Sequence, residues 1–128
     1  MSNPGEATAV LNGYLDIHRG ITFTGIAAEY LGLNTGQPGT AGSTNPSALT
    51  TRNLMTFTAA SGAAIAATIP SFTMTATETI THCHRGSTAT IGGGTFYGSH
   101  VLTTPVPVIA GSVVSFTSFV MGMGPAAV

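Results

Sequence analysis

The sequence predicts a mainly β fold, a small antiparallel β-sandwich or barrel of jelly-roll-like form with one short N-terminal helix. Short runs rich in threonine, valine, isoleucine and phenylalanine alternate with turns that contain glycine or proline, a pattern typical of sandwiches and barrels. Signals for a helix occur only within residues 1–20. Hydrophobic residues make up 43% of the 128 residues, enough for one core. Because no repeat or composition break divides the chain, we expect a single domain, residues 1–128.

Residues 1–20 predict an N-terminal arm followed by a helix. Asn3 is suited to cap the helix, Pro4 to its first position, and Glu6 lies three residues after the cap. Apolar residues then recur near helical spacing, and Gly20 is expected to end the helix. Because Gly13 costs the helix about 1 kcal/mol relative to alanine, we expect the helix to form only when it packs against the rest of the protein.

The β pattern begins at Ile21 and leads to residues 29–33, whose alternation predicts a half-buried strand. Glycine, proline and asparagine then crowd residues 34–46, which predicts a long loop of the kind that usually carries contacts. In residues 71–75 and 114–117 apolar residues alternate with serine or threonine, so one face of those strands should be solvent-exposed. The further strands are predicted at residues 54–58, 64–74, 78–84, 95–102, 106–109 and 113–121.

The composition excludes several classes of function. Charged residues make up 5% of the chain, and lysine is absent, so we expect no binding to nucleic acid. No apolar run approaches the roughly 20 residues of a membrane helix, and the first residues lack the pattern of a secretory signal. We therefore expect neither membrane insertion nor export. Cys83 is the only cysteine, which excludes a disulfide within the chain.

Residues 81–85 hold the most prominent cluster of potentially reactive side chains. On a strand His82 and His84 face one side and Cys83 the other, so the three cannot ligate one metal together. His82 and His84 could supply two metal ligands, but no carboxylate or second histidine pair stands at a metal-binding spacing. We therefore favour packed or interfacial histidines and expect no metal or other cofactor. Beside Arg85 a reactive thiolate is conceivable for Cys83, and a small buried side chain is preferred.

No catalytic arrangement is visible in the sequence. Residues 92–94 are three glycines without the lysine and helix start of a phosphate-binding loop, and a β-turn explains them. Ser99 and His100 are neighbours that face opposite sides of a strand, without a Gly-x-Ser-x-Gly turn. The acids are isolated in the sequence, so a glycosidase-like pair would have to be assembled by the fold from residues such as Asp16, Glu29 and Glu78. We expect no enzymatic activity and predict no catalytic or cofactor-binding residues.

Residues 11–16 and the run Leu-Gly-Leu-Asn-Thr-Gly-Gln-Pro-Gly at residues 31–39 are similar to motifs of a known family, and the similarity extends from about residue 11 to residue 120. The family that the sequence resembles consists of small bacteriophage structural proteins, common in phages of actinobacteria and often described as tail-fibre or minor tail proteins. Cys83, His84 and Arg85 stand where the family usually has apolar and aromatic residues. The motifs are turns and strand edges, so the resemblance implies a structural role and no active site.

Two locations on a phage particle follow. A single domain with neither a coiled-coil nor a collagen-like shaft favours a capsid decoration protein that stabilises the head, with contacts through residues 34–46 and the N-terminal arm. The alternative, implied by the family description, is a minor tail or tail-fibre protein that takes part in host-surface recognition. In both cases we expect a virion protein that is assembled in the host cytoplasm and binds the major capsid protein or other virion proteins. Low charge leaves little repulsion between copies, so we also expect a homo-oligomer, a trimer.

Overall fold

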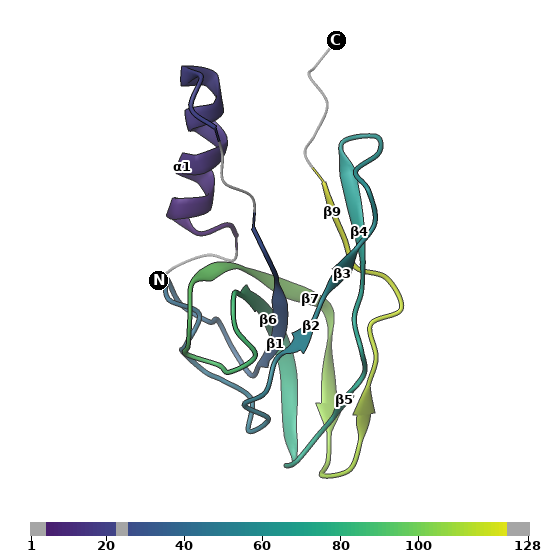
Figure 1. Ribbon diagram of the computed structural model, residues 1–128. Coiled ribbons are helices and arrows are strands. Elements are labelled where there is room, and N and C mark those ends of the chain that lie inside the picture. The colour runs from purple at the N-terminus through teal and green to yellow at the C-terminus, as the bar shows by residue number, and fades with distance from the viewer. Residues whose placement is uncertain (1–4, 23–25, 123–128) are drawn as a thin grey trace.

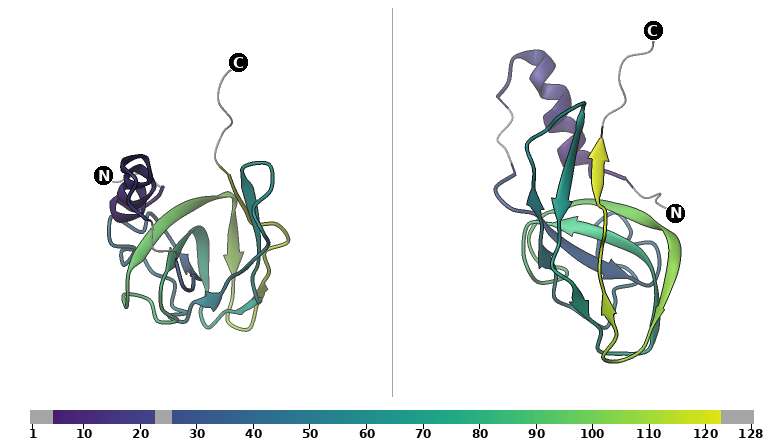
Figure 2. Two further views of the ribbon diagram at one scale, coloured as in Figure 1. Left: turned by 45° about the horizontal axis from the view of Figure 1, so that its top comes forward. Right: turned by 90° about the vertical axis from the view of Figure 1, so that its right-hand side faces the viewer.

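The structure, a computed structural model, describes residues 5–22 and 26–122. A β body carries two projections at one end (Figures 1 and 2). One projection is the helix α1 (Thr8–Asp16) with the 3-10 turn η1 (Ile17–Arg19), and the other is a sheet of β3 (Thr56–Phe57), β4 (Ala64–Thr68) and β9 (Val120–Gly122). The prediction of a mainly β fold with antiparallel sheets and one short N-terminal helix is confirmed. Among the described strands no sheet closes on itself, which excludes the barrel alternative.

The body is built on an antiparallel sheet in the order β2-β1-β6-β7. Its strands are β1 (Tyr30–Asn34), β2 (Asn53–Leu54), β6 (Glu78–Gly86) and β7 (Phe96–Val108). The long pair β6 and β7 aligns Cys83 with His100 and Arg85 with Gly98, and irregularities interrupt the register near both ends of the pair. This register brings His100 and Gly98 of β7 close to Arg85 of β6.

A two-stranded sheet, β5 (Phe72–Thr73) with β8 (Val113–Val114), accompanies the central sheet. Leu31, Leu33 and Cys83 enter the core from the central sheet, and their side chains are at most 1% exposed. Burial of this kind contributes about 25 cal/mol for each Å² of apolar surface removed from water. The core is completed by Met55, Ile69, Phe72, Met74, Ile80, Val108 and Val114.

The start of the helix differs from the prediction. α1 follows Ala7, whose side chain makes no cap hydrogen bond. Glu6 precedes the helix in an extended conformation and forms an ion pair with Arg85, so it does not close a capping box. The predicted cap Asn3 and the proline Pro4 lie outside the described residues. A carboxylate that can reach a buried guanidinium is held there more strongly than at a helix end.

The end of the helix matches the prediction, but its packing is sparse. Gly20 adopts the left-handed conformation (φ 76°) that ends η1. Within α1 only Val10 is buried, at 5% exposure. The large apolar side chains beyond it are exposed, namely Leu11 (44%), Leu15 (64%) and Ile17 (54%). The helix therefore presents an unpartnered apolar surface beyond its contact with the body.

Several predicted strands divide or merge. Residues 95–102 and 106–109 form one strand, β7, which is tolerated at Pro105 because β7 lies at the edge of the sheet. Residues 64–74 divide into β4 and β5 around Pro70, and residues 113–121 divide into β8 and β9. Residues 54–58 likewise divide into β2 and β3.

The β1 strand is more deeply buried than its half-buried pattern predicts. Its last four residues are all buried, so side chains on both faces of the strand are covered. β6 pairs with the whole of β1, and β2 pairs with its first two residues. Asn34, predicted as the first loop residue, is the last residue of β1. Residues 35–45 contain no helix or strand. In residues 71–75 Phe72 and Met74 are buried while their neighbours are exposed, as the alternation predicts. No helix in the part of the chain that the structure describes is long and apolar enough to cross a membrane.

Candidate functional site

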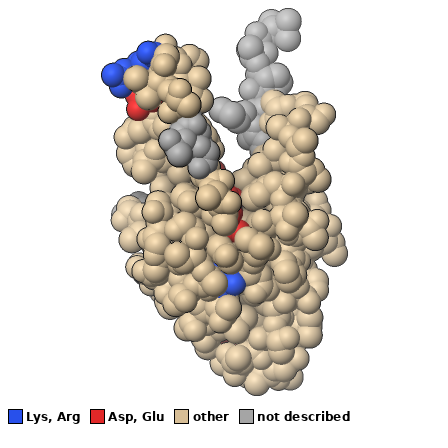
Figure 3. All heavy atoms as spheres, in the orientation of Figure 1, with Lys and Arg blue, Asp and Glu red and all other residues tan. Residues whose placement is uncertain are grey.

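A groove lies between the two projections of the molecule. Figure 3 shows the hollow between them, with acidic atoms at its base. The groove has a volume of about 1010 Å³. Its walls are mostly apolar and include Leu11 of α1 and, on the opposite side, Phe57, Ile65 and Met121. A concave apolar surface of this size on a small protein is typical of an interaction site.

The base of the groove holds one buried guanidinium that is shared by two carboxylates. Arg85 is 1% exposed, and its Nη1 donates to Glu29 Oε1 at 3.0 Å. Arg85 Nη2 donates to Glu6 Oε1, and Nε donates to His100 Nε2 at 2.9 Å. The second oxygens, Glu6 Oε2 and Glu29 Oε2, are buried and have no hydrogen-bond partner among the described residues. Two carboxylates thus share the single positive charge of Arg85.

Burial shifts the protonation of the groups around Arg85. It raises the pKa of the Glu29 carboxyl, an effect that exceeds the opposing influence of Arg85. It also raises the pKa of the Tyr14 hydroxyl, and the charge of Glu6 adds to this shift. Burial and then the charge of Arg85 lower the pKa of His100, so its ring is neutral and accepts the Nε hydrogen. With both carboxylates ionised, the cluster carries a formal charge of −1.

The close approach of β7 to the N-terminal arm requires glycine at position 98. A Cβ atom there would lie 2.7 Å from Arg85 Nη2 and 2.8 Å from the carbonyl oxygen of Gly5. Two backbone hydrogen bonds hold the arm against β7. Ser99 N donates to Gly5 O at 2.8 Å, and Ala7 N donates to Tyr97 O at 2.7 Å. These contacts place Glu6 at the groove base and set the position from which α1 rises.

The two metal candidates lie in different surroundings. His84 is fully buried, and its Nε2 accepts from Arg52 Nε at 2.8 Å, so its Nδ1 donates to Asn34 Oδ1 at 2.6 Å. Burial and the charge of Arg52 lower the pKa of His84 to about 4, which keeps the ring neutral. His82 is half-buried and contacts the Thr81 hydroxyl through Nδ1 at 2.8 Å. No group of three or more metal-ligating side chains gathers within residues 5–22 and 26–122.

Arg52 organises a second polar network in the body. It is 3% exposed and also donates to the carbonyl oxygens of Thr88 at 3.0 Å and Gly93 at 3.2 Å. Asn34 extends the network by donating to the Thr44 carbonyl at 3.1 Å. The network therefore joins the turn between β6 and β7 to the loop that follows β1. Its polar atoms are engaged within the protein, which indicates a structural role.

The remaining side chains considered for chemistry have structural partners. Cys83 is 1% exposed in the core, and burial raises the pKa of its thiol to about 12, so it is protonated at neutral pH. The ring of His100 is held by Arg85 and is not directed to its neighbour Ser99 as a base. Gly92 and Gly94 adopt φ values of 85° and 66° in the turn between β6 and β7, as expected of a glycine turn.

The three acids named in the sequence, Asp16, Glu29 and Glu78, do not meet one another in the structure. Asp16 pairs with Arg19 at the surface, and Glu78 accepts from the Ser47 hydroxyl, so these two acids do remain apart. Glu29, however, meets Glu6 on Arg85. Glu6 was not a candidate in the sequence, because its position suggested a helix cap. The usable signal was Arg85 itself, which directly follows a predicted strand, residues 78–84, and would need acidic partners once buried.

A family model matches nearly the whole of the described chain. The model of the family described as Gp80, Podophage GP4 fiber I protein gp80, matches residues 5–122. No curated protein matches the chain. The matched region includes α1, the groove and the β body. It supports the resemblance to phage structural proteins of the tail-fibre kind, while the narrower resemblance to actinobacteriophage proteins stays a prediction.

Proposed function

Because the chain belongs to the family of the podophage GP4 fiber I protein gp80, we propose that it is a structural subunit of a phage tail fibre, assembled from several copies of itself. The observation that carries this proposal is the extent of the family match, residues 5–122. The match supports the tail-fibre alternative better than the capsid decoration that the sequence favoured. The absence of a shaft motif does not argue against a tail fibre, because one subunit of a fibre need not contain the shaft.

The surface of the protein supports self-association. Exposed apolar side chains gather on the helical projection, where Leu15 and Ile17 are more than half exposed, and on the opposite projection, where Val120 is 61% exposed. The chain has seven charged residues, three arginines and four acids, so electrostatic repulsion between copies is weak. We propose a homotrimer in the virion. The internal hydrogen bonds of His84 and His100 and the buried thiol of Cys83 support a structural rather than a catalytic role.

Separation of the particle tests this function. Heads and tails of purified phage are separated on a density gradient, the protein is quantified in each by mass spectrometry, and intact particles are labelled with gold-conjugated antibody. We expect the protein with tails and the label on fibres. Stoichiometric copies on heads, with none on tails, would contradict the proposal and restore capsid decoration. Light scattering of the purified protein measures the order of the oligomer independently.

A further inference from the structure

The two carboxylates at the base of the groove could accept a further cation. Glu6 keeps 27% of its side chain exposed at the base, whereas the side chain of Glu29 is 6% exposed. Each carboxylate has one oxygen without a hydrogen bond, and an unsatisfied buried polar atom costs about 1–3 kcal/mol. Arg85 meets each carboxylate through one oxygen, so the two carboxylates share a single positive charge. The groove is therefore complementary to an apolar segment that carries one positive charge.

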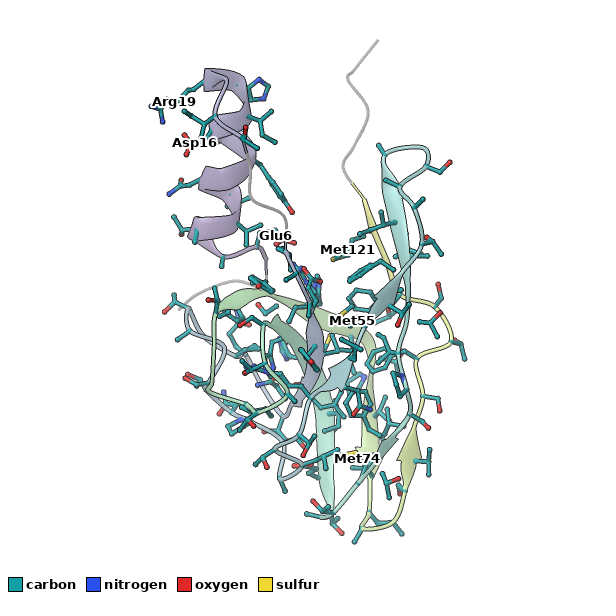
Figure 4. The ribbon with its side chains drawn as sticks, viewed as in Figure 1. Glu6, Asp16, Arg19, Met55, Met74 and Met121 are labelled. Atoms are coloured by element: carbon teal, nitrogen blue, oxygen red, sulfur yellow. The ribbon has the colours of Figure 1, made fainter. Side chains whose placement is uncertain are left out.

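The chain itself presents one such segment. Figure 4 places Asp16 and Arg19 at the end of α1 opposite to Glu6. We call residues 15–21 the tip. Arg19 is 70% exposed at the side chain, and it is the exposed cation among the described residues, since the other two arginines are buried and lysine is absent. The neighbouring apolar side chains of the tip, Leu15, Ile17 and Ile21, are 64%, 54% and 49% exposed.

We propose that the tip of one copy inserts into the groove of a second copy, with Arg19 facing the Glu6 and Glu29 carboxylates and the apolar side chains of the tip against the groove walls. The contact rests on the proposed function, since it supplies the self-association of the fibre subunit. Arg19 gives up only its surface pair with Asp16, and exposed ion pairs contribute about 0–1 kcal/mol.

The geometry requires the contact to be intermolecular. α1 forms one wall of the groove, and its tip lies at the far end from the groove base, so Arg19 of the same chain is directed away from Glu6 (Figure 4). Tip and groove are different surfaces, and every copy offers one of each. Such a head-to-tail contact closes into a ring, for example a trimer, or continues as a filament.

Two one-sided variants test the contact. The tip variant combines Ile17→Asp with Arg19→Glu, which changes only exposed side chains. The groove variant is Ala60→Trp, which places a large side chain in the groove from an exposed position on its wall. If circular dichroism shows that this variant folds poorly, Thr56→Trp, at a second exposed position on the wall, replaces it. The matched control is Ile109→Asp, which alters an equally exposed apolar residue in the turn after β7. Sedimentation velocity measures each protein at tens of micromolar.

We expect the unmodified protein and the control to associate and each one-sided variant alone to be monomeric. An equimolar mixture of the two variants should form a heterodimer, because one copy still offers its groove and the other its tip. Arg19→Glu alone should raise the dissociation constant by on the order of tenfold.

Three results would overturn the contact: a mixture that stays monomeric, a one-sided variant that associates like the unmodified protein, or an unmodified protein that is monomeric. A chain ending at residue 122 that associates more tightly than the full chain would also overturn it, since residues 123–128 would then be the occupant of the groove. None of these results changes where the protein is found on the particle, so the proposed function is tested separately.

Discussion

Replacing Arg85 with methionine should destabilise the protein by about 3–5 kcal/mol at pH 7. Methionine keeps much of the apolar stem but removes three hydrogen bonds, those to Glu6, Glu29 and His100. The two carboxylates then remain at the groove base without their cation. Removal of one partner from a buried ion pair costs more than the pair itself contributes, because the remaining charge is not compensated.

The chain offers a matched control in Arg19→Met. Arg19 pairs with Asp16 at 2.8 Å, a distance comparable to the 3.0 Å between Arg85 and Glu29, but the side chains of the surface pair are 70% and 41% exposed. Solvent screens this pair, so its loss should cost less than about 1 kcal/mol. The comparison separates burial from the mere presence of an ion pair.

Urea denaturation followed by circular dichroism measures both variants, provided that the m-values stay equal. The loss in Arg85→Met should shrink when the pH is lowered from 7 to 4, because protonation of the stranded carboxyls removes their charge. A loss below about 1 kcal/mol at pH 7, or an equal loss at both pH values, would refute the electrostatic account of the cluster.

Three further predictions concern the body. The pKa of His84 in the folded protein is about 4, against an ordinary value of 6.5. The stability that depends on its neutral ring is therefore fully present above pH 6.5 and is lost as the pH falls through about 4, by up to about 3 kcal/mol. An NMR titration of the His84 ring with a midpoint above 6 would contradict this. Gly42→Ala should cost more stability in thermal unfolding than Gly62→Ala, since both have positive φ but only a Cβ at position 42 would clash with a side chain, the ring of Phe96; equal melting temperatures would refute the clash. Cys83 should resist a thiol reagent at pH 8 in the native protein and react in denaturant; rapid native reaction would show that the thiol is accessible.

Local patterns in the sequence predicted the β class and most turns, because these depend on neighbouring residues. The Gly20 helix end is an example, since a left-handed residue at that position needs no distant partner. Two prolines, Pro70 and Pro105, show the limit of this reasoning. Pro70 interrupts a predicted strand, whereas Pro105 does not interrupt β7, because β7 is the edge strand of the central sheet. Whether a strand lies at an edge is a property of the whole sheet.

The candidate site could not be predicted because its parts are distant in sequence. Glu6 and Arg85 are separated by 79 positions, and Glu29 and Arg85 by 56. The local pattern at Glu6 favoured a helix cap, and the tertiary ion pair outweighed it. The burial of His84 depended in the same way on Arg52, 32 positions away. Sequence reasoning placed His84 on the correct strand but could not identify its partners.

The placement of the arginines also determines how the folded protein meets proteases. Trypsin cleaves after lysine and arginine, lysine is absent, and Arg52 and Arg85 are 3% and 1% exposed. In the native chain the bond after Arg19 is therefore the accessible trypsin site among the described residues, and cleavage at the other two arginines reports unfolding. A copy whose tip is covered by a neighbour would lose even that site. Resistance to trypsin would then increase with assembly.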